Sequence, residues 1–241
     1  MTRALEAELI KLRTTRTFFA FVASAVGLSL LVVVLFTALA DFDQEDVRSA
    51  FTADFASLFI TLLGAIGMAG EWRHRTIANT VLSSPQRLRL LGAKLIAYAV
   101  GGALLSLAVN VAIMAVGTAV LSSRGVDTLS FGDLLDVLWR NLAIAAFLGP
   151  IGVCVGTLIR NPAVAIVVIL GWGFVVENTL TAVAPEVEKF MPTNGAPSGI
   201  TQVQDPGFDT LPLGIALLVM AGWVALFFAA AAATFTKRDL V

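Results

Sequence analysis

Side chains that could catalyse a reaction or bind a metal ion are scarce in this chain of 241 residues. It contains one histidine, His74, and one cysteine, Cys154. One histidine cannot supply a histidine-rich zinc site or a haem held by two histidines, and one cysteine cannot form an intrachain disulfide. No Gly-x-x-x-x-Gly-Lys-Ser/Thr string provides a loop for ATP phosphates. The residues therefore predict a chain that is not an enzyme and binds no cofactor itself.

Three polar residues lie within apolar stretches and are candidates for lining a path through the protein: Glu177, Asn178 and Asn110. If those stretches cross a bilayer, ionisable side chains in them usually face the protein interior or a watery path, because exposure to lipid is costly. Glu177 has an alternative, which is to reach the headgroups from near a helix end. Asn110 and Asn141 have another, which is to hydrogen-bond between helices.

A densely basic segment, 71–93, separates two of the apolar stretches. Lys and Arg resist transfer across a bilayer, so this segment is expected on the cytoplasmic side. Glu71 and Arg73 could pair with charges on a protein partner, and the apolar Ile77 and Leu82 could seat in a groove of that partner. The alternative is a patch that attracts anionic lipid headgroups.

The composition is that of an integral membrane protein. Hydrophobic residues make up 58% of the chain, charged residues only 14%, and the mean hydropathy is +0.88. Soluble domains are about one quarter charged. The apolar stretches are continuous and do not alternate with polar residues, which favours membrane helices over the strands of a β-barrel. The sequence predicts an all-α membrane protein.

Six stretches are long enough to cross a bilayer at about 20 residues each. We place them at 18–40, 51–70, 94–121, 139–159, 163–183 and 213–235. The first could instead be a signal peptide, but its 23 residues exceed the usual apolar region of such peptides. The segment 184–212 contains five prolines and is expected to cap the outer face with short helical turns. Residues 1–241 are thus predicted to form one transmembrane domain.

The distribution of charge orients these helices. With both termini on the cytoplasmic side, twelve of the sixteen Lys and Arg residues fall in cytoplasmic segments or at their helix ends. The four exceptions are Arg48, Arg124, Arg140 and Lys189. The acidic residues show the opposite bias. Because an odd number of helices would disturb both patterns, we expect six helices with both termini in the cytoplasm.

Residues 1–17 predict an amphipathic helix before the first span. Leu5, Leu9 and Leu12 recur at helical spacing on one face, and basic residues occupy the other. Such a helix lies in the headgroup layer of a membrane. The alternative is an ordinary basic anchor beside the first span, at the same membrane surface.

Small residues recur at spacings that permit close helix packing. Gly152 and Gly156 form a GxxxG pattern, and Gly64, Gly67 and Gly70 follow one another every three residues. Close packing within one chain is the simpler interpretation, and packing between two chains is the alternative.

The order of these features resembles the permease subunits of ABC-2 type ABC transporters. The similarity lies in Glu71-x-Arg73-x-x-Thr76-Ile77, then Leu82-Ser83-Ser84-Pro85, then Leu91-Gly92-Ala93-Lys94. The motif covers about twenty-five residues, and the order of helices covers nearly the whole chain. Many members have Gly where Arg75 stands here.

The resemblance implies a transport subunit that docks a separate ATPase through the cytoplasmic segment. The residues it assigns to this coupling loop are Glu71, Arg73, His74, Arg75, Thr76, Ile77, Leu82, Pro85 and Arg87. ATP and Mg would be bound by the ATPase subunit, and a second permease chain, expected as a homodimer, would complete the path. Export of a drug, peptide, lipid or other amphiphile across the cell membrane is the expected activity, with membrane lipids and no nucleic acid as further partners.

Other classes of membrane protein remain as alternatives. An ion-coupled secondary transporter would need paired broken helices in two repeated halves, whereas only one predicted span contains an interior proline, Pro150, and no repeat is visible. A channel-like protein or scaffold, and a membrane enzyme, are the other candidates. An ATPase with Walker motifs encoded beside this gene would favour the ABC-2 interpretation.

Overall fold

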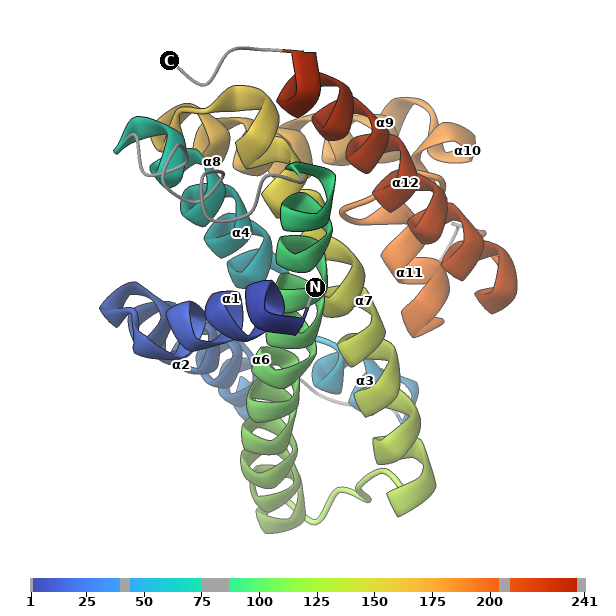
Figure 1. Cartoon of the computed structure of the whole chain (residues 1–241). Helices are drawn as coiled ribbons and strands as arrows, with labels where there is room; N and C mark the ends of the chain where they lie inside the picture. Colours follow the sequence, from blue (N-terminus) through green and yellow to red (C-terminus); the bar gives the residue numbers. More distant parts are fainter. Residues whose placement is uncertain (1, 40–43, 75–86, 204–208, 238–241) are drawn as a thin grey trace.

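A computed structural model describes residues 2–39, 44–74, 87–203 and 209–237, and this part of the chain is helical, with no strand (Figure 1). The helices are α1 (Thr2–Thr14), α2 (Arg16–Leu39), α3 (Gln44–Phe51), α4 (Ala56–Arg73), α6 (Arg87–Ser123), α7 (Phe131–Ile159), α8 (Pro162–Gly171), the π-helix η1 (Trp172–Glu177), α9 (Asn178–Val183), α10 (Pro185–Glu188), α11 (Gly195–Thr201) and α12 (Leu213–Lys237).

Six helices in the described residues are long and apolar enough to cross a membrane, which confirms the predicted number. Several bounds differ from the prediction. The second span, predicted to start at residue 51, is preceded by α3 and a break, and α4 begins only at Ala56. Helix α4 continues to Arg73 and α6 begins at Arg87, so both ends of the predicted loop 71–93 belong to helices. Backbone hydrogen bonding can continue beyond the apolar run, which is why composition alone underestimates helix length.

Local capping explains where α7 and α8 begin and end. The side chain of Ser130 accepts a hydrogen bond from the Asp133 amide at 3.2 Å, which starts α7 at residue 131, eight residues before the predicted span. Helix α7 ends where Arg160 adopts a left-handed conformation with φ of 58°. Asn161 then caps α8, and Pro162 takes the first helical position, where its missing amide donor is not needed.

Helix α7 lies at the centre of the helix bundle, with α4, α6 and α12 packed around it. Glycines permit the closest of these contacts. A Cβ atom on Gly152 would overlap the backbone of Thr61, and one on Gly156 would overlap the backbone of Ala65. A Cβ atom on Gly64 would meet the α7 backbone in the same way. Gly64, Gly152 and Gly156 therefore pack α4 on α7 within the chain, as the simpler interpretation predicted. Gly67 instead faces Tyr98 of α6, and a Cβ atom on Gly70 would meet nothing within 4 Å.

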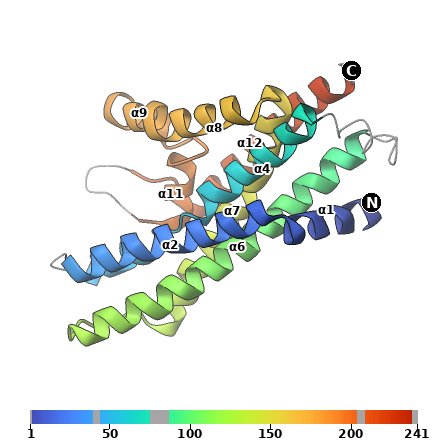
Figure 2. The same cartoon turned by 90° about the vertical axis from the view of Figure 1, so that its left-hand side faces the viewer.

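The bundle has two ends that differ in content (Figure 2). One end, which we call the termini side, holds α1, the last turn of α4, the start of α6 and the end of α12. The opposite end, which we call the far side, holds α11 and the last residues of α9. The sequence prediction assigns the termini side to the cytoplasm.

Helix α1 crosses α6 on the termini side (Figure 1). Leu5 and Leu9 pack against a hydrophobic core to which α2, α4, α6, α7 and α12 contribute, whereas Ile10 is exposed. The predicted amphipathic helix is thus present and ends at Thr14. Part of its apolar face is covered by the protein itself, so burial against α6 holds the helix in place in addition to any contact with lipid.

Candidate functional site

Four charged residues meet on the termini side, and we call them the charge cluster: Glu8, Lys11, Glu71 and Lys94. The Lys94 ammonium lies 2.8 Å from a carboxylate oxygen of Glu71 and 2.8 Å from one of Glu8. The Lys11 ammonium also donates a hydrogen bond to Glu71. The charge cluster therefore joins α1, α4 and α6 at one point.

The charge cluster is largely shielded from solvent. The side chains of Lys94, Glu71 and Glu8 are 3%, 7% and 8% exposed, and that of Lys11 is 51% exposed. Burial opposes the charge of Lys11, but its hydrogen bond to Glu71 and the negative charges of Glu71 and Glu8 raise the pKa of Lys11 above its ordinary value. Two carboxylates are matched by two ammonium groups, so the charge cluster is balanced as it stands.

Aromatic contacts attach the end of α4 to two further helices. The guanidinium carbon of Arg160, just after α7, lies 3.7 Å from the centre of the Trp72 ring, a cation–π contact. The same ring meets Phe235 of α12 edge to face, with 5.9 Å between ring centres. Movement of the last turn of α4 would therefore disturb α1, α6, α7 and α12.

The predicted coupling-loop residues have different positions in the structure. Glu71 is buried and pairs within the chain, whereas Arg73 and His74 are exposed. Arg87 begins α6. Arg75, Thr76, Ile77, Leu82 and Pro85 lie outside the described residues. Sequence reasoning did not assign Glu8 and Lys11 to this site. Their separation of three residues on a helix makes them neighbours on its surface.

A second polar group lies toward the far side, in the break between α3 and α4. One oxygen of Asp54 accepts the Ala56 amide at 2.7 Å, and the other accepts the hydroxyl of Ser106 and the amide of Asn110 at 2.9 Å. Asn141 of α7 donates to the Asn110 carbonyl oxygen at 2.8 Å. The predicted hydrogen bond between helices at Asn110 and Asn141 is confirmed.

Glu177 is fully buried and binds a connecting segment of the far side. Its carboxylate accepts the indole N–H of Trp172 at 2.5 Å and the backbone amides of Thr193 and Asn194 at 3.1 and 2.6 Å. The hydroxyl of Thr193 donates to it as well. Glu177 ends the π-helix η1, and the wider turn of a π-helix changes the direction of the side chains that follow. Glu177 thus holds the residues before α11 against the membrane helix.

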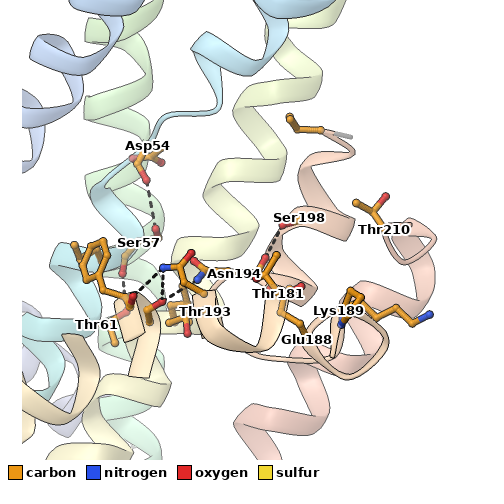
Figure 3. Close-up of a pocket in the computed structure, with 18 of the residues that line it drawn as sticks. Asp54, Ser57, Thr61, Thr181, Glu188, Lys189, Thr193, Asn194, Ser198 and Thr210 are labelled. Atoms are coloured by element: carbon orange, nitrogen blue, oxygen red, sulfur yellow. Dashed lines mark hydrogen bonds between the residues drawn. The ribbon is translucent and has the colours of Figure 1, made fainter. Parts of the chain in front are cut away.

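A cavity of about 990 Å³ opens between α4, the run from α8 to α9, and the segment that holds α10 and α11 (Figure 3). A smaller cavity of about 280 Å³ shares part of its wall. The described residues common to both walls are Asp54, Ser57, Thr193, Asn194, Ser198 and Val203. Asp54 therefore borders both spaces.

The three predicted path residues relate to this cavity in different ways. Asn178 lines it directly and donates to the Phe174 carbonyl at 3.0 Å. Glu177 does not line it but fixes two residues that do. Asn110 is fully buried behind Asp54 and donates to it. The sequence contained no pattern for the cavity, because its wall combines segments far apart in the chain.

Comparison with known proteins identifies the family. A family model described as ABC-2 family transporter protein matches residues 4–176, which include the charge cluster and Asp54. No curated protein matches the chain. Because the matched region covers more than half of the sequence and six helices are able to cross a membrane, the chain belongs to the ABC-2 transporter family and is a multi-pass membrane permease.

Proposed function

We propose that this permease works with a separate ABC ATPase, which docks on the termini side and supplies the ATP and Mg chemistry. A second copy of the chain completes the transporter as a homodimer in the cell membrane, and the pair exports an amphiphile. Membership of the family supports the general assignment. The direction of transport, the docking surface and the homodimer belong to this proposal.

The charge cluster is the observation that carries the docking proposal. It joins α1 to α4 and α6, the two helices that flank the segment 74–86. A force applied to that segment by an ATPase would therefore reach α4 directly, and α4 packs closely on α7 through glycines. A rigid helix whose position is changed both by the ATPase and by the transported molecule is a physical means of coupling ATP hydrolysis to transport.

The far-side cavity supports an amphiphile as the transported molecule. Its wall combines apolar side chains, among them Leu58 and Phe174, with hydroxyl and amide groups such as Thr193 and Asn194. A molecule with an apolar body and a polar group satisfies both kinds of wall.

The test is to co-express the chain with a candidate ABC ATPase subunit from the same genome and to purify the two together. The test variant is Arg73→Glu. Arg73 is exposed at the end of α4, so the substitution reverses a charge on the proposed docking surface without disturbing the core. Arg16→Glu is the matched control, since Arg16 is an exposed arginine at a helix end beside α1. Recovery of the ATPase and its rate of ATP hydrolysis are measured for each.

We expect Arg73→Glu to reduce recovery of the ATPase and its hydrolysis in the complex, while Arg16→Glu leaves both at the wild-type level. The monomer's thermal stability should be the same in both variants. Equal recovery from the two variants and the wild type would show that Arg73 faces lipid or solvent, and would remove this end of α4 from the docking surface.

A further inference from the structure

The walls of the far-side cavity carry more negative than positive charge. Four described carboxylates line it, those of Asp54, Glu186, Glu188 and Asp209, against one ammonium, that of Lys189. The Lys189 ammonium is itself paired with Glu186. Three carboxylates therefore face the cavity without a cation among the described ion pairs.

Asp54 is the innermost of these carboxylates. All of its described hydrogen bonds come from neutral donors, namely the Ala56 amide, the Ser106 hydroxyl and the Asn110 amide. Such donors favour the ionised carboxylate but do not cancel its charge. Figure 3 shows Asp54 and Ser57 on one wall and Glu188 and Lys189 on another, so negative groups border the space from separate elements.

Glu188 is a second site of negative charge, on the outer wall. Burial and the nearby charge of Glu177 raise the pKa of Glu188 above its ordinary value. The carboxylate therefore lies in an environment that disfavours its negative form, and a cation placed in the cavity would relieve this.

Apolar side chains supply another part of the wall: Phe55, Leu58, Leu148, Ile169 and Phe174. The volume of about 990 Å³ is at the upper end of the range of cavities that hold small molecules, about 300–1,000 Å³. Two of these side chains are aromatic rings, whose faces attract cations. The cavity therefore offers an apolar surface and a negative field in the same space.

We infer that the far-side cavity binds organic cations, molecules that carry a quaternary or protonated amine or a similar positive centre on an apolar body. The positive centre lies toward Asp54, and the apolar body contacts Leu58, Ile169 and Phe174. This inference rests on the proposed transport function, because it assigns organic cations as the class of amphiphile that the permease moves.

The experiment measures binding to the full-length chain alone, in nanodiscs of uncharged phosphatidylcholine, by equilibrium dialysis. The probe is tetraphenylphosphonium, and the matched probe is tetraphenylborate, which has nearly the same size and the opposite charge. No ATPase is present, so a failure to bind would overturn this inference and leave the docking proposal to its own test.

Variants that remove a negative or a positive charge from the wall distinguish recognition of charge from simple partition of an apolar probe. Asp54→Asn and Glu188→Gln should each weaken tetraphenylphosphonium binding by roughly three- to tenfold, the effect of losing one partly screened charge contact. Lys189→Gln should strengthen it, because the only described cation of the wall is removed. Asp133→Asn is the control, since Asp133 is a partly exposed carboxylate outside the cavity.

The expected pattern is weaker binding for the two carboxylate variants, tighter binding for Lys189→Gln and no change for Asp133→Asn. Tetraphenylborate should show the reverse order or no binding above empty nanodiscs. Glu188→Gln keeps the test valid if Asp54→Asn fails to fold, because Glu188 lies in a short outer helix and not in the buried hydrogen-bond group. Equal binding of tetraphenylphosphonium across all variants, or the same variant order for both probes, would overturn the inference.

Discussion

Two carboxylates in contrasting environments mark the two ends of α4, Glu71 in its last turn and Asp54 just before its first residue. At the termini side, Glu71 is buried and matched by Lys94 and Lys11, and the cluster is balanced with Glu8. At the far side, all the described donors to Asp54 are neutral, and it borders a cavity with further carboxylates. The first arrangement needs no ligand to neutralise it. The second has room and charge for one.

This contrast indicates a division of labour along a single helix. A balanced, shielded ion cluster fixes the positions of α1, α4 and α6, and removing one of its buried members leaves an uncompensated buried charge. An unbalanced polar cavity contributes less to stability and more to recognition. The tests below address the two ends, and the helix contact that joins them, in order of the expected effect on stability.

The largest effect is expected from Lys94→Met. The substitution leaves the buried carboxylates of Glu8 and Glu71 with only the half-exposed Lys11 as a cation. Breaking a buried pair in this way costs about 3–5 kcal/mol. We expect a marked fall in the unfolding temperature and in the monodisperse yield from detergent.

Lys11→Ala is the control for this prediction. Its ammonium pairs with the same Glu71, but the side chain is 51% exposed, so water replaces much of the lost interaction. We expect a cost of under about 1 kcal/mol. If the two lysine variants unfold at the same temperature, the charge cluster is hydrated in the membrane and does not lock the three helices.

The next effect concerns the α4–α7 contact between the two ends. Gly152→Val would place side-chain atoms against the Thr61 backbone, and overpacking of this kind costs about 1–3 kcal/mol. Gly222→Val is the matched control, because a Cβ atom on Gly222 meets nothing within 4 Å. Thermal unfolding in detergent compares them. A cost at Gly222 equal to that at Gly152 would mean that the glycines act through backbone freedom and not through close packing.

The packing role of Gly152 was foreseeable, whereas the polar contacts were not. Apolar runs of bilayer length predicted six helices, and a GxxxG spacing predicted close approach, because both are properties of one helix considered alone. The pairing of Glu8 with Lys94 joins residues 86 positions apart and depends on how α1 crosses α6. The Asp54 contacts likewise require the relative registers of α4, α6 and α7.

Glu177 illustrates the same limit. Its sequence position suggested a path residue, and the structure shows a carboxylate surrounded by four donors. The side chain of Glu177 is turned by the wider π-helix Trp172–Glu177, and the apolar pattern of the sequence does not reveal that helix. A side chain can therefore influence a cavity without facing it.

Glu177→Gln should have a moderate effect, confined to the far side. One amide oxygen can still accept, but the NH₂ group would face the donors of Thr193 and Asn194, at a cost of about 1–3 kcal/mol. We expect faster hydrogen exchange at those two amides and little change in the charge cluster. Glu186→Gln, on the exposed outer wall, is the control. Unchanged exchange in Glu177→Gln would show that the segment before α11 is held by other contacts.

The smallest effect is expected from Glu188→Gln, and it concerns pH. Burial and the charge of Glu177 raise the native pKa of Glu188 above the ordinary value of 4.5. A carboxyl group with a raised native pKa favours the folded state below its ordinary pKa and loses that contribution as pH rises through the native value. The wild type should therefore lose a little stability between about pH 4.5 and neutral pH, and the glutamine variant should lose less.

At neutral pH, the gain from Glu188→Gln should be under about 0.5 kcal/mol, because solvent screens a partly exposed group. The comparison uses unfolding temperatures of the wild type and the variant at acidic and neutral pH. Saturating tetraphenylphosphonium should reduce this difference in stability. A bound cation stabilises the ionised Glu188 of the wild type, whereas the glutamine variant has no carboxylate there to stabilise. Glu186→Gln, whose carboxylate is already paired with Lys189, should give no gain at neutral pH. A gain as large for Glu186→Gln would mean that the negative charge is spread over the whole outer surface and that the cavity is not its focus.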